Sequence, residues 1–371
     1  MRIGVPREIK IHEYRVGLTP AGVRELTSHG HTVTVERAAG LGIGASDDDY
    51  VRAGARIAPD AAEVFAAADL VVKVKEPQPV ERALLREGQV LFTYLHLAPD
   101  PEQARELMAS GVVAIAYETV TSGRGGLPLL APMSEVAGRM SVQAGAHCLE
   151  KESGGLGLLL GGVPGVDAAK VTILGGGVVG SNAALIALGM GARVTVLDRS
   201  LDALRRLTDR FGAQLGTCHS THDAVEQHVT GADLVIGGVL VPGAAAPKLI
   251  SRDMLQAMRT GSVIVDVAID QGGCTETSRP TTHADPTYVV DGVVHYCVAN
   301  MPGAVARTST LALTAATLPY VLALADKGWR RALGDDPYLL QGLNICAGAV
   351  THAGVAEALG VAHRPAAGML G

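Results

Sequence analysis

Residues Val171–Asp198 read VTILGGGVVGSNAALIALGMGARVTVLD and carry the strongest structural signal in this chain. An apolar run of strand type leads directly into the glycine pattern Gly175-x-Gly177-x-x-Gly180. A helical stretch follows, and a second strand-like run ends at Asp198. The order strand, glycine turn, helix and strand predicts a βαβ unit that binds a dinucleotide.

Each glycine of this pattern has a separate physical role. Gly175 permits a tight turn, Gly177 lets backbone N–H groups approach a pyrophosphate, and Gly180 allows the helix to pack closely on the strand. The helix N-terminus adds unpaired N–H donors and the positive end of the helix dipole. Asp198, about 20 residues further on, is suited to accept hydrogen bonds from the adenosine ribose and to repel a 2′-phosphate, which favours NAD over NADP. Arg199 follows directly and is the residue that would instead suit a 2′-phosphate.

The composition is typical of a globular protein with two domains. The chain has 371 residues, of which 48% are hydrophobic and 18% are charged, and its net charge is −6. A chain of this length can form two domains with full cores. The acidic balance, without a basic run that contains aromatic residues, leads us to expect no nucleic-acid partner.

The sequence also bears on location and on metals. The N-terminal segment MRIGVPREIK lacks the apolar core of a signal peptide, and no segment reaches the roughly 18 unbroken apolar residues that cross a bilayer. The five cysteines are scattered and have no Cys-x-x-Cys spacing, which indicates neither a disulfide framework nor a zinc site. We therefore expect a cytoplasmic protein with no membrane partner.

Before the glycine pattern, strand-like runs alternate with helix-like stretches. The strand-like runs are Arg2–Val5, Val33–Glu36, Leu70–Val74, Val90–Thr93 and Val112–Ala116. The helix-like stretches include Pro20–His29, Glu81–Glu87 and Pro101–Ala109. The first of these helices follows Thr19, a good N-cap residue, and has proline at its first position. This alternation predicts right-handed βαβ crossovers and a parallel sheet.

A second series of strands surrounds and follows the glycine pattern. It comprises Arg193–Leu197, Leu234–Ile236 and Ser262–Val267, with a hairpin of Tyr288–Val290 and Val293–His295 around Asp291-Gly292. A long helix, Pro132–Glu150, precedes this series, and another, Thr308–Ala325, follows it. The predicted fold is α/β, with a Rossmann-type doubly wound parallel sheet in an NAD-binding domain over residues 131–304. A second α/β domain with a parallel sheet, discontinuous over residues 1–130 and 305–371, would bind the substrate, with a cleft between the two.

Polar residues at the carboxyl ends of strands are the candidates for chemistry, because open parallel sheets bind ligands there. Arg15 offers a planar fork that matches a carboxylate, and Lys75 ends a strand with a second positive charge. His96 closes an apolar run and can transfer protons near neutral pH. Asp270 precedes a glycine turn. The ordinary structural interpretations are a surface arginine, a solvated lysine, a histidine satisfied by backbone partners and an aspartate that caps its turn.

Taken together, these motifs resemble those of alanine dehydrogenases, in the alanine dehydrogenase and pyridine nucleotide transhydrogenase α-subunit family. The resemblance spans essentially the whole chain. Beside the glycine pattern, the matching stretches are Gly4–Glu8, Glu13–Pro20, Lys73–Pro77, Tyr94–Leu97, Ala131–Arg139 and Asp266–Cys274. The resemblance implies an NAD-dependent enzyme that reversibly deaminates L-alanine to pyruvate and ammonia, and it implies a homohexamer.

The resemblance further implies roles for individual residues. Arg15 and Lys75 would hold the carboxylate and keto group of the substrate, His96 would donate and accept the proton, and Asp270 would be its catalytic partner. The implied NAD-binding residues are Ser134, Gly175, Gly177, Val178, Val179, Gly180, Asp198, Ser220, Val239, Leu240, Val267, Ala268, Ile269, Asp270, Arg279, Val298, Ala299, Asn300 and Met301. Some relatives hold magnesium on the late helix, where Ala323 and Lys327 supply no oxygen ligand in this chain, so we expect no metal.

Other functions fit the same two-domain plan. A transhydrogenase-type subunit would bind the same cofactor but would have little use for Arg15, Lys75 and His96 together. An opine-type or saccharopine-type dehydrogenase would use a second amino acid in place of ammonia. A non-catalytic NAD-binding regulator would bind NADH without oxidising it in the presence of pyruvate and ammonium.

Overall fold

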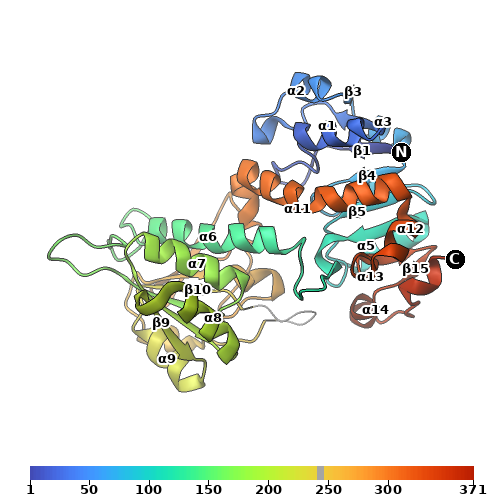
Figure 1. Ribbon diagram of the computed structural model, residues 1–371. Helices are drawn as coiled ribbons and strands as arrows, with labels where there is room; N and C mark the ends of the chain where they lie inside the picture. The colour runs from blue at the N-terminus through green and yellow to red at the C-terminus, as the bar shows by residue number, and fades with distance from the viewer. Residues whose placement is uncertain (240–245) are drawn as a thin grey trace. The chain divides into compact units, whose positions relative to one another are not determined.

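The computed structural model describes residues 1–239 and 246–371, and the chain divides into two compact units. The first unit comprises Met1–Met133 with Gly303–Gly371, and the second comprises Ser134–Pro302. In Figure 1 the first unit is drawn in blue to cyan and in orange to red, and the second in green to tan. The assignment of substrate binding to the first unit and of NAD binding to the second stays a prediction.

The first unit contains an eight-stranded sheet in the order β15-β14-β6-β5-β4-β1-β2-β3. Its strands are β1 (Arg2–Val5), β2 (Thr32–Glu36), β3 (Arg56–Ala58), β4 (Leu70–Val72), β5 (Val90–Thr93), β6 (Val113–Ala116), β14 (Leu343–Cys346) and β15 (Ala349–Val350). Strands β1 to β6 pair in parallel, as the alternation predicts. The chain order changes direction between β1 and β4, which makes these neighbours the switch point of the sheet.

One edge of this sheet differs from the expectation of a wholly parallel sheet. β14 pairs antiparallel with β6, and β15 pairs antiparallel with β14. The two residues that join them, Ala347 and Gly348, have φ angles of 47° and 71°. Two consecutive residues with positive φ form the tight turn that matches the twist of a hairpin, so the chain returns without a helical crossover.

Helices cover this sheet and mostly begin at side-chain caps. They are α1 (Pro20–Ser28), α2 (Asp47–Arg52), α3 (Ala61–Ala67), α4 (Pro79–Arg82), α5 (Pro101–Ser110), α11 (Ala306–Lys327), α12 (Trp329–Asp335), α13 (Pro337–Leu340) and α14 (Ala353–Leu359), with the 3-10 turns η1 (Leu41–Ile43), η2 (Tyr117–Thr119), η5 (Met301–Val305, which begins in the second unit) and η6 (Ala366–Met369). The Thr19 hydroxyl accepts a hydrogen bond from the Gly22 N–H at 3.2 Å, which confirms the predicted start of α1.

Two expected boundaries near β4 are wrong, and at each one a side-chain carboxylate accepts a hydrogen bond from a backbone N–H. β4 ends at Val72 rather than Val74, because the Val74 N–H donates to the Glu8 carboxylate instead of to a neighbouring strand. The predicted helix Glu81–Glu87 is the short α4, which begins earlier, at Pro79. There the Glu81 carboxylate accepts from the Gln78 N–H at 2.8 Å and so caps the helix start.

Helix α11 is long and apolar. The segment Met301–Lys327 passes a test of length and composition for a helix that crosses a membrane, with 44% of its most apolar window buried within the structure. The core helix of a soluble protein passes the same test. In the first unit the Thr310 hydroxyl of this helix accepts a hydrogen bond from the Val16 N–H, which ties α11 to the loop after β1.

The second unit contains a seven-stranded sheet in the order β12-β13-β11-β10-β7-β8-β9. Its strands are β7 (Lys170–Leu174), β8 (Arg193–Asp198), β9 (Leu215–His219), β10 (Leu234–Gly237), β11 (Val263–Asp266), β12 (Thr287–Val290) and β13 (Val293–Tyr296). The order β9-β8-β7-β10-β11-β13 is that of a Rossmann sheet, with its switch point between β7 and β10. Antiparallel β12 closes the predicted hairpin with β13.

Helices pack on both faces of this second sheet. They are α6 (Ala131–Cys148, which begins in the first unit), α7 (Val178–Gly189), α8 (Leu201–Phe211), α9 (His222–Thr230) and α10 (Arg252–Ala257), with the 3-10 turns η3 (Gly212–Gln214) and η4 (Val267–Gln271). Alternate strand residues enter different cores: Val171 and Ile173 pack with Val142 of α6, whereas Leu174 packs in the cluster that contains Val225 of α9. This period of two confirms buried strands covered on both sides.

The end of β11 differs from the sequence prediction. Apolar residues continue to Ile269, but the strand ends at Asp266 and η4 follows. The fully buried Asp266 carboxylate accepts hydrogen bonds from the N–H groups of Ala268 and Cys274, at 3.1 and 2.8 Å. These bonds turn the chain before the apolar run is finished, and they place Asp270 inside the 3-10 turn.

Candidate functional site

The loops that carry Arg15 and Lys75 leave the carboxyl ends of β1 and β4, the two strands at the switch point of the first sheet. His96, the predicted catalytic residue, follows β5, the next strand, so it leaves the same edge of the sheet as the two predicted substrate-binding residues. This edge is where an open parallel sheet binds its ligand.

Arg15 is a buried residue, with 3% of its surface exposed, so the interpretation as a surface arginine is wrong. Its Nε and Nη2 donate to the two carboxylate oxygens of Glu13 at 2.7 and 2.6 Å, and Nη1 lies 3.0 Å from the sulfur of Met133. Burial opposes its charge, but the bonds to Glu13 raise the pKa of Arg15 above its ordinary value. Glu13 thus fixes the orientation of a permanently charged guanidinium.

Lys73 lies beneath this edge in a buried ion cluster. Its ammonium donates to Glu81 at 2.6 Å and to Glu8 at 3.3 Å, and all three side chains are almost completely buried. Burial opposes its charge, but the two carboxylates hold the pKa of Lys73 above its ordinary value. Sequence reasoning did not assign a role to Lys73, although a lysine inside the apolar run Leu70–Val74 was a signal for a buried partner.

Lys75 is mostly buried, with 13% of its side chain exposed, and its Nζ lies 3.8 Å from Oε2 of Glu76. The other oxygen of Glu76 pairs with Lys10. Burial alone would raise the pKa of Glu76, but Lys75, Lys10 and, more weakly, His96 hold it below its ordinary value. The ammonium group of Lys75 thus lies just beyond the end of β4, mostly shielded from solvent and close to one carboxylate.

His96 is exposed and has an unusual backbone conformation, with φ = 50°. Its ring stacks on Tyr94, with the two ring centres 5.8 Å apart and the planes inclined by 13°. The buried Tyr94 hydroxyl donates to the Leu129 carbonyl at 2.5 Å, which fixes the ring that supports the imidazole. An exposed imidazole on a rigid platform is suited to proton transfer.

The glycine loop lies at the switch point of the second sheet. Gly175 has φ = 100°, and a Cβ atom on Gly180 would lie 1.8 Å from the Gly175 carbonyl oxygen. A Cβ atom on Gly177 would meet no atom within 4 Å. Gly175 and Gly180 are thus required by the fold itself, whereas the space at Gly177, at the N-terminus of α7, fits a dinucleotide phosphate.

Asp198 ends β8 beside this loop. Its carboxylate accepts hydrogen bonds from the Gly176 and Ser200 N–H groups at 2.6 and 2.7 Å. The Ser220 N–H donates to the Asp198 carbonyl at 3.0 Å, so Ser220 lies against the same strand end. Arg199 is exposed. These contacts fix the carboxylate next to the loop that the dinucleotide fold uses, and the residues of this edge fit NAD.

The other predicted cofactor residues mostly follow strands of the same sheet. Val239 follows β10, residues 267–270 lie in η4 after β11, and residues 298–301 follow β13. Leu240 lies outside the described residues. Arg279 is exposed and its guanidinium lies 4.0 Å from the centre of the Tyr288 ring. Ser134 lies on α6 and is half-buried.

The predicted catalytic pair falls in different units. His96 belongs to the first unit and Asp270, which is exposed, to the second. Their partnership stays a prediction. Within the described residues, no group of three or more His, Cys, Asp and Glu side chains is arranged to hold a metal ion.

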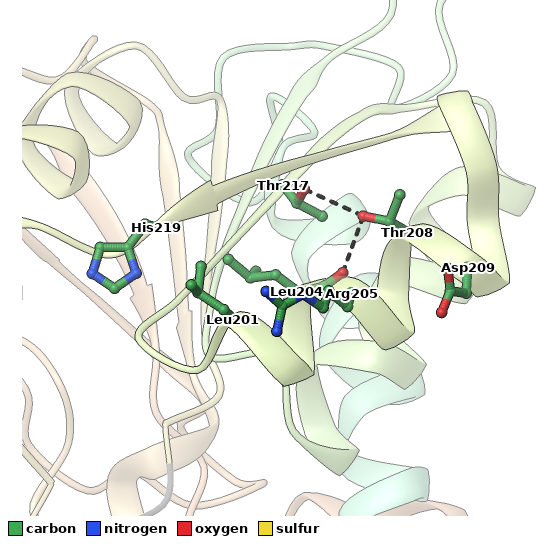
Figure 2. Close-up of a pocket in the computed structure, with 7 residues that line it drawn as sticks. All are labelled: Leu201, Leu204, Arg205, Thr208, Asp209, Thr217 and His219. Atoms are coloured by element: carbon green, nitrogen blue, oxygen red, sulfur yellow. Dashed lines mark hydrogen bonds between the residues drawn. The ribbon is translucent and has the colours of Figure 1, made fainter.

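A shallow surface pocket of about 350 Å³ lies between α8 and β9. Figure 2 shows its lining, in which the Thr208 hydroxyl contacts the Leu204 carbonyl and the Thr217 hydroxyl. The lining residues are Leu201, Leu204, Arg205, Thr208, Asp209, Thr217 and His219. None of them is a predicted site residue.

Comparison with known proteins identifies close relatives. The N-terminal and C-terminal domain models of the family described as alanine dehydrogenase/PNT match residues 4–137 and 141–353. The chain is 63% identical to an alanine dehydrogenase of Halomonas elongata over 100% of both chains, and 57% identical to that of Bacillus subtilis over 99% of this chain and 97% of the relative. A solved L-alanine dehydrogenase superimposes with a TM-score of 0.94 at 53% identity, covering 97% of this chain and 99% of the other. A solved transhydrogenase from Sinorhizobium meliloti superimposes with a TM-score of 0.81 at 26% identity, covering 95% of this chain and 99% of the other.

Proposed function

This chain belongs to the alanine dehydrogenase/PNT family, and we propose that it catalyses the NAD-dependent, reversible oxidative deamination of L-alanine to pyruvate and ammonia. The observation that carries the proposal is the set of Arg15, Lys75 and His96 at one edge of the first sheet. A fixed guanidinium, an ammonium and an exposed imidazole suit a small amino acid rather than a second nucleotide. This favours amino-acid chemistry over the transhydrogenase-type alternative.

The glycine loop and Asp198 would hold NAD. Backbone N–H groups at the start of α7 would bind the pyrophosphate, and the Asp198 carboxylate would bind the adenosine ribose. When bound, NAD accepts the hydride that leaves the Cα of the substrate.

The charged residues of the first unit would bind and orient the amino acid. Arg15, held by Glu13, provides a fixed positive charge for the carboxylate. Lys75 stabilises the partial negative charge on the oxygen of the keto product and of its hydrated precursor. Lys73 has no exposed surface, which keeps it from contact with a substrate, and Glu8 links it to Lys75 by accepting a hydrogen bond from the Lys75 N–H at 3.3 Å.

His96 would move the protons. As a neutral imidazole it removes a proton from the water that attacks the substrate imine, and it returns a proton as ammonia leaves. In the reverse direction the imidazolium acts as the acid. General acid–base catalysis of this kind contributes about 10²–10⁴ to the rate. Asp270 is the proposed partner of His96 in this step.

A spectrophotometric assay tests the proposal. The purified chain should reduce NAD in the presence of L-alanine, with little reduction of NADP, and should oxidise NADH in the presence of pyruvate and ammonium. NADH oxidation that requires a second amino acid instead of ammonium would indicate an opine-type or saccharopine-type enzyme. Tight NADH binding without either reaction would contradict the proposal and favour an NAD-binding regulator.

The proposal includes a cytoplasmic homohexamer that has no nucleic-acid or membrane partner. The support is the family membership and the acidic net charge of −6. Light scattering after gel filtration should give about six times the chain mass of 38.1 kDa. A monomer that retains full activity would contradict this part alone.

A further inference from the structure

The backbone at His96 needs an external support. Its φ of 50° lies in the left-handed region, which residues with a Cβ atom rarely adopt. His96 follows β5 in an irregular segment, exposed between the buried Leu95 and Leu97, so the strand itself does not impose this angle. The contacts that hold the turn therefore decide where the imidazole points.

Glu118 supplies such a contact from the adjacent strand. It lies in η2, directly after β6, which pairs with β5. Its Oε1 accepts hydrogen bonds from the N–H groups of His96 and Leu95, at 2.7 and 3.2 Å, and its Oε2 lies 3.2 Å from the Leu95 N–H. One carboxylate thus holds two consecutive peptide groups.

A second side chain holds the same turn from the other side. Gln103, fully buried on α5, donates from its Nε2 to the Leu95 carbonyl at 2.6 Å. The Leu95 peptide groups are therefore engaged by Glu118 through the N–H and by Gln103 through the carbonyl. The ring of His96 is left to stack on Tyr94.

We propose that Glu118 is a positioning residue for His96, whose carboxylate holds the left-handed turn and thereby aims the imidazole at the substrate. This inference rests on the proposed role of His96. Oε1 makes both the 2.7 Å bond to His96 and a 3.2 Å bond to Leu95, whereas Oε2 makes only one 3.2 Å bond to Leu95, so the position of Oε1 should carry the main effect.

Two conservative variants separate position from charge. Glu118→Gln removes the charge and replaces Oε2 by an amide nitrogen, but its oxygen can still take the place of Oε1 and accept from both peptide N–H groups, so kcat should stay within about 3-fold of the wild type. Glu118→Asp keeps the charge but is one methylene shorter, and kcat should fall by about 10- to 100-fold, because a small misplacement of a catalytic group is costly. KM for L-alanine and the Kd for NADH should change by less than about 3-fold in both variants. Equal losses in the two variants, or a loss only in Glu118→Gln, would overturn the proposal.

A double-variant cycle with His96 separates this inference from the proposed function. His96→Asn removes the imidazole, while asparagine tolerates the left-handed backbone. If Glu118 acts only through His96, Glu118→Asp in the His96→Asn background should cause no further loss of kcat. A further loss of the full size would show that Glu118 acts elsewhere. Full activity of His96→Asn alone would instead refute the role of His96.

Asp69 offers the matched structural control. Its carboxylate also accepts a hydrogen bond from a backbone N–H of the same sheet, that of Arg2 at 3.1 Å, but at the amino end of β1. Asp69→Glu should leave kcat unchanged. A loss of kcat there equal to that in Glu118→Asp would mean that any damage to the sheet lowers turnover, and it would overturn a specific role for Glu118.

Discussion

Each of the two sheets has a switch point, and the residues at the two switch points differ in kind. We call the strand ends at the switch point of the first sheet the first edge, and those of the second sheet the second edge. Between β1 and β4 lie buried charged side chains, such as the Glu13–Arg15 pair and the Lys73 cluster. Between β7 and β10 lie glycines, and a Cβ atom on Gly175 would come within 2.8 Å of the Gly238 carbonyl oxygen. The topology provides a ligand-binding edge in both cases, and the side chains decide which ligand fits.

The difference follows from the ligands that each edge would bind. A small amino acid presents single charges that side-chain ions can match, and such ions remain charged in a protein interior only when they are paired. A pyrophosphate needs several donors close together, which backbone N–H groups provide where no side chain intervenes. The first edge should therefore be sensitive to loss of charge, and the second to added volume.

The largest expected effect is on stability at the first edge. Lys73→Met would leave Glu8 and Glu81 buried without their common partner, and should lower the free energy of unfolding by about 3–5 kcal/mol. Urea denaturation measures this change. Lys170→Met, at an exposed lysine that begins β7, is the control and should stay within about 0.5 kcal/mol. Equal changes in the free energy of unfolding of the two variants would contradict the expectation that the first edge is especially sensitive to loss of a buried charge.

Added volume should have the next largest effect, at the second edge. In Gly180→Ala the new methyl group would lie 1.8 Å from the Gly175 carbonyl oxygen, so the loop must move. The Kd for NADH should rise by about 10- to 100-fold, as expected for overpacking of about 1–3 kcal/mol. Isothermal titration calorimetry would measure the Kd for NADH. Gly189→Ala, on the same helix α7 but with no atom within 4 Å of the new Cβ, should bind NADH normally. Unchanged affinity in Gly180→Ala would contradict the expected sensitivity of this loop to added volume.

Loss of a charge at the second edge should matter less. Asp198→Asn replaces one acceptor oxygen by an amide donor that faces the Gly176 or Ser200 N–H group. The affinity for NADH should fall by about 10-fold, and the preference over NADPH should shrink. Asp202→Asn, an exposed position on α8 that pairs with Arg205, should change neither affinity. An unaltered ratio of NADH to NADPH affinity in Asp198→Asn would mean that this carboxylate does not select the cofactor.

The smallest effect concerns the pH dependence of stability at the first edge. Burial alone would raise the pKa of Glu76, but Lys75 and Lys10 hold it below its ordinary value. A carboxyl group with a lowered pKa in the folded state stabilises the protein above its unfolded pKa of about 4.3, and this contribution is lost as the pH falls through the folded value. Glu76→Gln should therefore be less stable than the wild type near neutral pH and equally stable in acid.

Urea denaturation across that pH range checks this prediction. The exposed Glu152 of the second unit provides the control, since Glu152→Gln should not alter the pH dependence. A constant difference between Glu76→Gln and the wild type at every pH would show that Glu76 acts by packing and not by its charge.

Residues close together in the sequence determined the second edge. The glycine spacing, the flanking apolar strands and Asp198 lie within one βαβ unit, so the loop, its helix and the family resemblance followed from Val171–Asp198 and a few other motifs. Thr19 and Pro20 likewise determined the start of α1. Such features depend on local turn chemistry and hydrogen bonds within a few residues, which a sequence contains in full.

Tertiary structure alone decided the partners at the first edge. Arg15 was recognisable as a candidate, but its burial depends on the packing of the loop around Glu13 and Met133. Glu8 reaches Lys73 only because β1 pairs with β4, and Glu118 reaches His96 only because β6 pairs with β5. The antiparallel pair β14–β15 joins this sheet from the far end of the chain. Strand order is set by burial of whole faces, a property of the assembled core that no short stretch of sequence contains.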